Sequence, residues 1–136
     1  MPLHWIAQNC HLARVYADIA DGWGDSVKPI LHFWADNPQL ASFRNPLLKE
    51  KGSVYYNDPD QLMIGNPGLS VSEWEAQMGM WVMFAAPLIL STEIRRGALS
   101  AEAKRVLLNK EVLALADDPL GLQVQLFQAF QNGCLV

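Results

Sequence analysis

Ten residues decide the fold of this chain: Asn57-Asp58-Pro59-Asp60-Gln61-Leu62-Met63-Ile64-Gly65-Asn66. They follow the short apolar run Val54-Tyr55-Tyr56, so the pattern predicts a strand that ends in a polar loop. Pro59 fixes its own φ at about −65° and biases Asp58 toward an extended backbone, so the aspartate side chains leave a stiff segment. Such a loop suits a ligand site, although the same residue types also form ordinary surface turns.

A second polar pattern lies near the N-terminus. The run Arg14-Val15-Tyr16-Ala17-Asp18-Ile19 alternates polar and apolar residues, which predicts a strand over 13–18 with Arg14, Tyr16 and Asp18 on one face. An arginine and an aspartate near a strand end indicate part of a polar cleft. An ion pair on an exposed strand is the alternative interpretation.

Strands and helices are predicted to alternate along the chain. After the strand over 13–18, the spacing of Val27, Ile30, Leu31, Phe33 and Trp34 predicts a helix. After the strand over 54–56, a capping box at Ser70 and Glu73, or at Ser72 and Glu75, begins a helix that Pro87 ends. This second helix presents the apolar residues Trp74, Met78, Trp81, Val82 and Ala85.

A third pair of elements follows. Residues 88–92 predict a strand, and Ser100 caps a helix that includes Ala101, Lys104, Arg105, Leu107 and Leu108. Residues 35–53 predict an irregular connection, because Asn37-Pro38 and Asn45-Pro46 discourage regular structure. Near the C-terminus, residues 122–126 alternate with the period of a strand.

Composition excludes several classes of function. The net charge is −4 and no Lys/Arg cluster is present, so we expect no nucleic-acid partner. No apolar run approaches the ~20 residues of a membrane span, and no targeting signal is visible. His4, His11 and His32 lack the companion ligands of a metal site, and there is no Gly-rich phosphate loop, so we expect no metal and no cofactor.

An ordered series of motifs connects these patterns. Asn57-Asp58-Pro59-Asp60 is followed by Ile64-Gly65-Asn66 and then by Ala85-Ala86-Pro87-Leu88. The series also includes Cys10, Arg14, Ala17-Asp18-Ile19, Trp23, Gly68-Leu69-Ser70, Gln77-Met78, Trp81 and Asp118-Pro119-Leu120-Gly121. On these residues the chain resembles glycoside hydrolase family 27, the α-galactosidases and α-N-acetylgalactosaminidases, over roughly residues 10–121.

The resemblance implies an α/β fold, a partial TIM (β/α)8 barrel. A complete barrel takes about 250 residues, whereas this chain has 136. We therefore expect residues 1–121 to form the C-terminal portion of the catalytic barrel, its last three strand-helix units. Residues 122–136 would be a truncated tail that starts a C-terminal β domain.

The resemblance also implies a reaction and roles for four residues. Family members hydrolyse terminal α-linked galactose or N-acetylgalactosamine with retention, using two carboxyl groups about 5–5.5 Å apart. Asp18 matches the general acid/base, which must hold a proton and so needs partial burial or a neighbouring negative charge. Arg14 would bind sugar hydroxyls, Asp60 would accept hydrogen bonds from the sugar, and Asp58 would brace the loop.

The nucleophile has no counterpart here. In the family it is an aspartate within a Lys-x-Asp-x-Cys pattern on the fourth strand, and this chain contains no such pattern. The family residues that choose between galactose and N-acetylgalactosamine also lie upstream. Whether the chain by itself is an enzyme stays open: the alternative is a non-catalytic remnant that binds carbohydrate weakly or packs against a partner.

Further expectations come from the family alone. Members are lysosomal or secreted, often homodimeric and metal-independent. The cysteine at the Cys10 position pairs in the family with one on the preceding unit, which is not in this sequence, so Cys10 and Cys134 are expected to be free, buried thiols. The chain departs from the family pattern at Ala13, Tyr56, Gln61 and Ala116-Asp117.

Overall fold

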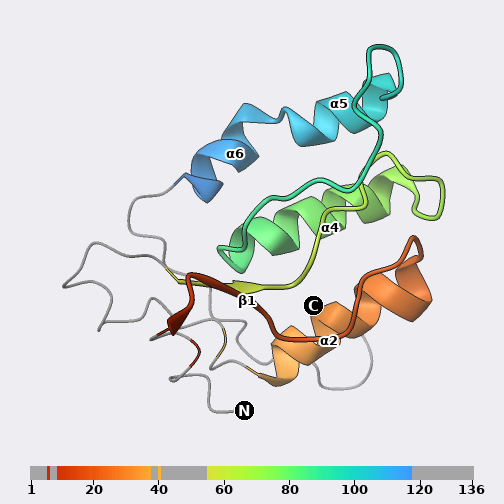
Figure 1. The fold of residues 1–136 in the computed structure, drawn as a ribbon. Coiled ribbons are helices and arrows are strands. Elements are labelled where there is room, and N and C mark those ends of the chain that lie inside the picture. The colour runs from red at the N-terminus through yellow and green to blue at the C-terminus, as the bar shows by residue number, and fades with distance from the viewer. Residues whose placement is uncertain (1–5, 7–8, 38–39, 41–54, 118–136) are drawn as a thin grey trace.

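The computed structural model describes residues 6, 9–37, 40 and 55–117. Its elements are two short strands, each followed by helical segments, in the order β1, η1, α2, β2, α4, α5 and α6. Helix α4 lies between α2 and the pair formed by α5 and α6 (Figure 1). The described part of the chain is therefore an α/β unit.

The two strands are parallel and each is three residues long. Strand β1 (Leu12–Arg14) pairs with β2 (Tyr56–Asp58) in a register that places Leu12 opposite Tyr56 and Arg14 opposite Asp58. The predicted strand ends, at residue 18 for the first strand and at residue 56 for the second, are wrong. Strand β1 ends earlier because its pairing with β2 ends at Arg14, and β2 extends through Asn57 and Asp58 because their polar side chains find partners inside the protein.

The third predicted strand, over 88–92, is reduced to one parallel bridge between Leu62 and Leu90. The Leu62 N–H donates to the Ile89 carbonyl at 2.7 Å, and the Ser91 N–H donates to the Leu62 carbonyl at 2.9 Å. The segment after Asp60 therefore continues the parallel arrangement that β1 and β2 begin.

The first predicted helix is present in two parts. A π-helical turn, η1 (Trp23–Val27), continues into α2 (Lys28–Asp36). Val27, Ile30 and Trp34 are buried, as the spacing predicts. The helix ends one residue before Asn37, which precedes Pro38 and therefore disfavours helical backbone.

Helix α4 (Val71–Met83) begins with the first of the two predicted capping boxes. The Ser70 hydroxyl accepts from the Glu73 N–H, and the Glu73 carboxylate accepts from the Ser70 N–H at 2.7 Å. The prediction that Pro87 ends this helix is wrong, since Phe84 is already the C-cap and Ala85 has a φ of +49°. The chain turns there because the Ala86 N–H donates to the Trp81 carbonyl at 3.0 Å.

Two short helices follow. Ser100 caps α5 (Ala101–Leu107) by accepting from the Ala103 N–H at 3.0 Å, as predicted. Leu108 lies beyond the end of α5, and α6 (Lys110–Ala116) begins directly afterwards. Asn109 caps α6 by accepting from the N–H groups of the first turn, a signal that the sequence contains and that the helix prediction missed.

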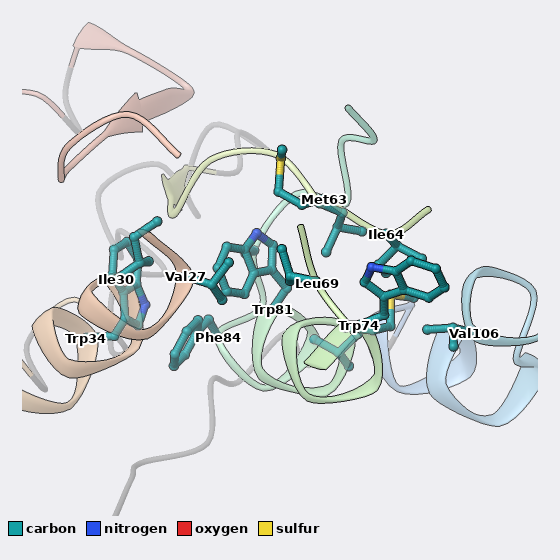
Figure 2. Close-up of a cluster of buried hydrophobic side chains, with 14 of the residues drawn as sticks. Val27, Ile30, Trp34, Met63, Ile64, Leu69, Trp74, Trp81, Phe84 and Val106 are labelled. Carbon is teal, nitrogen blue, oxygen red and sulfur yellow. The ribbon is translucent and has the colours of Figure 1, made fainter. Parts of the chain in front are cut away.

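The core lies between the helices and the segment that follows β2 (Figure 2). Three aromatic rings connect α2 with α4: Trp34 and Phe84 have ring centroids 5.3 Å apart, and Phe84 and Trp81 have centroids 6.1 Å apart. The fully buried members of the core are Val27, Ile30, Leu62, Ile64, Trp81, Phe84 and Ala103.

Some predictions fall outside the described residues. They are most of the connection over 35–53, the strand over 122–126, and Cys134. Cys10 is a free thiol, as expected, but the expectation that it is buried is wrong, because its side chain is exposed. None of the described helices is long and apolar enough to cross a membrane.

Candidate active site

The candidate site lies where the parallel strands end. Arg14 and Asp58 are the last paired residues of β1 and β2, so the chain leaves both strands at the same edge of the sheet. In α/β proteins with parallel strands, ligand sites form at this carboxyl edge. Asp18 and Asp60 lie in the two segments that follow.

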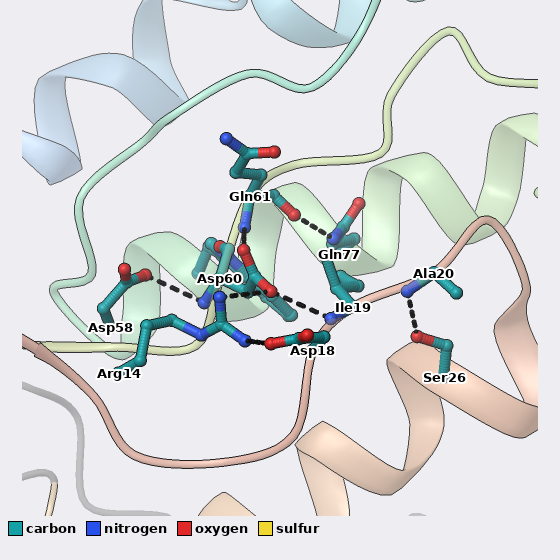
Figure 3. A network of polar contacts seen from close by, with 10 residues as sticks. Arg14, Asp18, Ile19, Ala20, Ser26, Asp58, Asp60, Gln61 and Gln77 are labelled. Atoms are coloured by element: carbon teal, nitrogen blue, oxygen red, sulfur yellow. Dashed lines mark hydrogen bonds and ion pairs between the residues drawn. The ribbon is translucent and has the colours of Figure 1, made fainter.

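Arg14 bridges the two segments through a pair of carboxylates (Figure 3). One guanidinium nitrogen lies 2.6 Å from Asp18 Oδ1, and the other lies 2.8 Å from Asp60 Oδ2. The Asp18 side chain is 97% exposed, whereas the Asp60 side chain is only 11% exposed. The arginine therefore joins a carboxylate that faces solvent to one that faces the protein.

Asp60 is held from several directions. Its Oδ2 also accepts from the Ile19 N–H at 2.8 Å, and its Oδ1 accepts from the Gln61 N–H at 2.8 Å. Its carbonyl accepts from the Trp81 indole N–H at 2.7 Å. The φ of Asp60 is +83°, a conformation that L residues rarely adopt and that these contacts must stabilise.

Asp58 supports this loop from inside. Its Oδ1 accepts from the Asp60 N–H at 2.8 Å, and the residue is 7% exposed. Burial raises the pKa of Asp58 and the neighbouring charge of Asp60 adds to the increase, while the hydrogen bond from the Asp60 N–H and the Arg14 charge act in the opposite direction.

Asn57 connects β2 with the segment around Leu40. Its side-chain amide donates to the Leu40 carbonyl at 2.9 Å and its oxygen accepts from the Tyr55 hydroxyl at 3.0 Å. Burial, followed by the charge of Cys10, raises the pKa of Tyr55. The residue before Asp58 is thus fixed by its own buried contacts.

The loop after β1 is fixed by two further contacts. The Ala20 N–H donates to Ser26 Oγ at 2.6 Å, and the Gly68 N–H donates to Asp21 Oδ2 at 2.9 Å. A Cβ at position 68 would lie 2.1 Å from the Asp21 carbonyl oxygen, so this approach requires glycine.

The expected single strand face of Arg14, Tyr16 and Asp18 is not observed. Strand β1 ends at Arg14, and Tyr16 stacks on Phe33 of α2 with ring centroids 4.4 Å apart. Arg14 and Asp18 nevertheless meet, through an ion pair four residues apart in the chain. The two residues are therefore brought together by the loop after β1 and not by strand alternation.

Comparison with known proteins identifies the family. A family model described as alpha galactosidase A matches residues 2–118. The chain belongs to this family, glycoside hydrolase family 27. It is 40% identical to human alpha-galactosidase A over 118 residues, which are 87% of this chain and 25% of the human protein. It is 36% identical to chicken (Gallus gallus) alpha-N-acetylgalactosaminidase over 118 residues, 87% of this chain and 27% of that protein.

Solved structures agree on the fold. The crystal structure of alpha-galactosidase I from Mortierella vinacea superposes with a TM-score of 0.70 at 22% identity, over 85% of this chain and 31% of that one. By length, the chain spans about a quarter of the curated relatives it matches.

The structure brings together the four residues to which the family 27 resemblance gives roles in the site. Arg14, Asp18, Asp58 and Asp60 lie at one end of the strands. The acid/base role in family 27 leads us to expect a partly buried carboxyl group at Asp18. In the part of the chain that the structure describes, the Asp18 side chain is instead 97% exposed. Among the described residues no group of three His, Cys, Asp or Glu side chains is placed to hold a metal ion.

Sequence reasoning about the site missed the contribution of α4. Gln77 is fully buried and contacts the segment after Asp60 on both sides of Leu62. The available signal was its position three residues after Trp74 and four before Trp81, a polar residue within the apolar stripe of a helix.

Proposed function

We propose that this chain is part of a retaining α-galactosidase-like glycoside hydrolase and supplies the acid/base side of its active site. The substrate class is glycoconjugates with terminal α-linked galactose or N-acetylgalactosamine. The observation that supports this proposal is the bridge from Arg14 to Asp18 and Asp60 at the carboxyl edge of a parallel strand pair, in a chain of this family.

For the fold, we propose that residues 1–121 are the last three strand-helix units of a TIM barrel and that residues 122–136 start a C-terminal β domain. The parallel pairing of β1 with β2 and the parallel bridge from Leu62 to Leu90 support three consecutive positions of one sheet. Helices after each of these positions support the same arrangement.

In the proposed mechanism, Asp18 moves a proton twice. A nucleophilic carboxylate attacks the anomeric carbon, the glycosidic bond breaks, and Asp18 gives its proton to the departing oxygen. In the second step, the Asp18 carboxylate takes a proton from water, and the water oxygen attacks the anomeric carbon and releases the nucleophile. The exposed Asp18 carboxylate is free to face a substrate.

The other polar residues hold this geometry. Arg14 fixes one oxygen of Asp18 and would also contact the sugar hydroxyls. A carboxylate has about four acceptor positions. Arg14, Ile19 and Gln61 occupy three of those on Asp60, which leaves one for a sugar hydroxyl. Asp58 braces the loop by accepting from the Asp60 N–H.

The proposal needs a nucleophile from outside this sequence, since the chain has no Lys-x-Asp-x-Cys pattern. We place it on the fourth barrel strand of the complete polypeptide. By analogy with the family, that polypeptide is lysosomal or secreted and often forms a homodimer, and it requires no metal or cofactor.

The missing nucleophile pattern favours a second candidate for the chain taken by itself. This candidate is a non-catalytic remnant that binds carbohydrate weakly or packs against a partner. The mature transcript distinguishes the two: an upstream reading frame that encodes the fourth-strand aspartate supports the enzyme, and a stop codon directly upstream of Met1 supports the remnant.

The test of the acid/base assignment is Asp18→Asn in the complete polypeptide. We expect hydrolysis of substrates with poor leaving groups to slow by about 10² to 10⁴, the range for loss of a general acid. Activated aryl glycosides should lose less in the glycosylation step, because their leaving groups need little protonation. Asp60→Asn should slow hydrolysis of both substrate classes, through lost sugar hydrogen bonds.

The measurement is pre-steady-state and steady-state hydrolysis of a series of aryl and alkyl α-galactosides. Equal losses on activated and unactivated substrates, with deglycosylation shown not to limit the rate, would mean that Asp18 is a binding residue.

A further inference from the structure

Within the described residues, the segment around Leu62 forms a parallel bridge with another segment on one edge only. Leu62 bonds to Ile89 and Ser91 through its N–H and its carbonyl, as one edge of a parallel sheet requires. The strand on the other side, β1, stops pairing at Arg14, opposite Asp58. The loop that carries Asp18 then diverges from the sheet, and this divergence forms the site.

The Gln77 side chain binds the backbone edge that β1 leaves unpaired. In a strand, the carbonyl before a residue and the N–H after it point to the opposite edge from that residue's own groups. Here these groups are the Gln61 carbonyl and the Met63 N–H. The Gln77 amide donates to the first at 3.3 Å and accepts from the second at 2.9 Å.

Helix α4 therefore holds the strained loop at two levels. Gln77 binds the backbone after Asp60, and Trp81, one turn later, donates to the Asp60 carbonyl at 2.7 Å. Both side chains are fully buried, so no solvent is available to replace their hydrogen bonds. Figure 3 shows Gln77 on α4 beside the loop, with a dashed line from its amide to the Gln61 carbonyl.

The same loop holds the segment that carries Asp18. The Asp60 carboxylate accepts from the N–H of Ile19, the residue after Asp18, and pairs with Arg14, which in turn pairs with Asp18. A displacement of Asp60 would thus move both groups that orient the Asp18 carboxylate.

We propose that Gln77 is a positioning residue for the acid/base: it replaces a strand neighbour, keeps Asp60 in its left-handed conformation and thereby orients Arg14 and Asp18. This inference rests on the proposed function. It adds to that function a residue that touches neither substrate nor the reacting atoms.

The test compares two substitutions in the complete polypeptide, Gln77→Met and Gln77→Glu. The readout is the ratio of kcat/KM on an unactivated α-galactoside to kcat/KM on an activated aryl α-galactoside. A loss of folded protein lowers both rates equally and leaves this ratio unchanged, whereas a misplaced acid lowers it. We expect Gln77→Met to lower the ratio by about 10- to 100-fold, the effect of displacing a reacting group by roughly 1 Å.

Gln77→Glu supplies a rescue by protonation. A neutral carboxyl group can donate to the Gln61 carbonyl and accept from the Met63 N–H as the amide does, whereas its ionised form cannot donate. We expect the ratio for Gln77→Glu to return toward the wild-type value as the pH falls, and the ratio for Gln77→Met to stay low. The neighbouring carboxyl groups of Asp58 and Asp60 are common to both variants.

Met78→Ala is the matched control, because Met78 is a buried neighbour on α4 with an apolar side chain in the core. It should lower stability and leave the ratio unchanged. A wild-type ratio in Gln77→Met, or failure of Gln77→Glu to recover or to fold at acidic pH, would overturn the positioning role. Absence of any α-glycosidase activity in the wild-type polypeptide would instead contradict the proposed function itself.

Discussion

At the scale of single residues, three neighbouring aspartates differ in what surrounds them. Asp18 is exposed and ion-paired, Asp60 accepts from two backbone N–H groups and from Arg14, and Asp58 is buried with one hydrogen bond to its carboxyl group. Three aspartates that lie close together therefore have different roles. Asp18 faces solvent, Asp60 anchors the loop, and Asp58 braces the loop from a buried position.

The raised pKa of Asp58 gives a prediction about pH. The folded state binds the Asp58 proton more tightly than the unfolded state, so the free energy of unfolding falls as the pH rises from the usual aspartate pKa through the raised one. Asp58→Asn keeps an oxygen that can accept from the Asp60 N–H and removes this titration. The stability of the variant relative to wild type should therefore increase over that pH window.

Urea unfolding of the complete polypeptide at a series of pH values measures this difference. Asp36→Asn, which removes an exposed carboxyl group at the end of α2, is the control for the change of charge itself. A relative stability of Asp58→Asn that is flat across the window would show that burial does not perturb Asp58.

At the scale of elements, helix α4 has two roles. It contributes side chains to the core, and it holds the loop of Asp60 through a hydrogen bond from Trp81. Its N-terminus is fixed by the capping box of Ser70 and Glu73. Ser70→Ala removes the hydroxyl acceptor and should destabilise the protein by about 1 kcal/mol. Ser72→Ala, within the first turn, should change stability by no more than about 0.5 kcal/mol.

Thermal and urea unfolding of both variants checks this prediction. The comparison is sharp because the sequence offers two serines with a glutamate three residues later, and only Ser70 forms the box. Similar losses for the two substitutions would mean that the box contributes nothing specific.

At the scale of the whole molecule, the sheet is narrow and apolar side chains remain exposed. Within the described residues, no strand lies beyond β1. Leu12, Tyr56 and Ile89 are each about two-fifths exposed, at 41%, 40% and 41%, and Ile94, Leu108 and Leu115 are 72%, 67% and 68% exposed. Open strand edges and exposed apolar surface promote association.

The isolated 136-residue chain should therefore self-associate. Size-exclusion chromatography with light scattering should show species larger than a monomer, and a hydrophobic dye should bind strongly. A monomeric peak together with a sharp cooperative thermal transition would contradict this expectation.

The isolated chain should also have no α-galactosidase or α-N-acetylgalactosaminidase activity. An acid without a nucleophile can protonate a leaving group but cannot form the glycosyl-enzyme intermediate. The assay is release of p-nitrophenol from the two aryl glycosides. Turnover by the purified chain that disappears in Asp18→Ala would show that the chain contains a nucleophile of its own.

The family, the succession of strands and helices, and the local signals at the ends of the helices could be predicted from the sequence. Ser70 with Glu73, Ser100 and the apolar stripe of α2 are short-range patterns, and each is present in the structure because its energy depends on residues within a few positions. The motif around Asp58 and Asp60 indicated a stiff acidic loop for the same reason.

The ends of the strands and the contacts that hold the site depend on pairing between distant parts of the chain. Strand β1 stops at Arg14 because its neighbour across the sheet stops there, which alternation along one strand cannot reveal. Asp60 adopts a positive φ because Trp81 and Gln77, contributed by a helix later in the chain, satisfy the backbone around it. These contacts join residues 14 or more positions apart, and no local pattern specifies such a pairing.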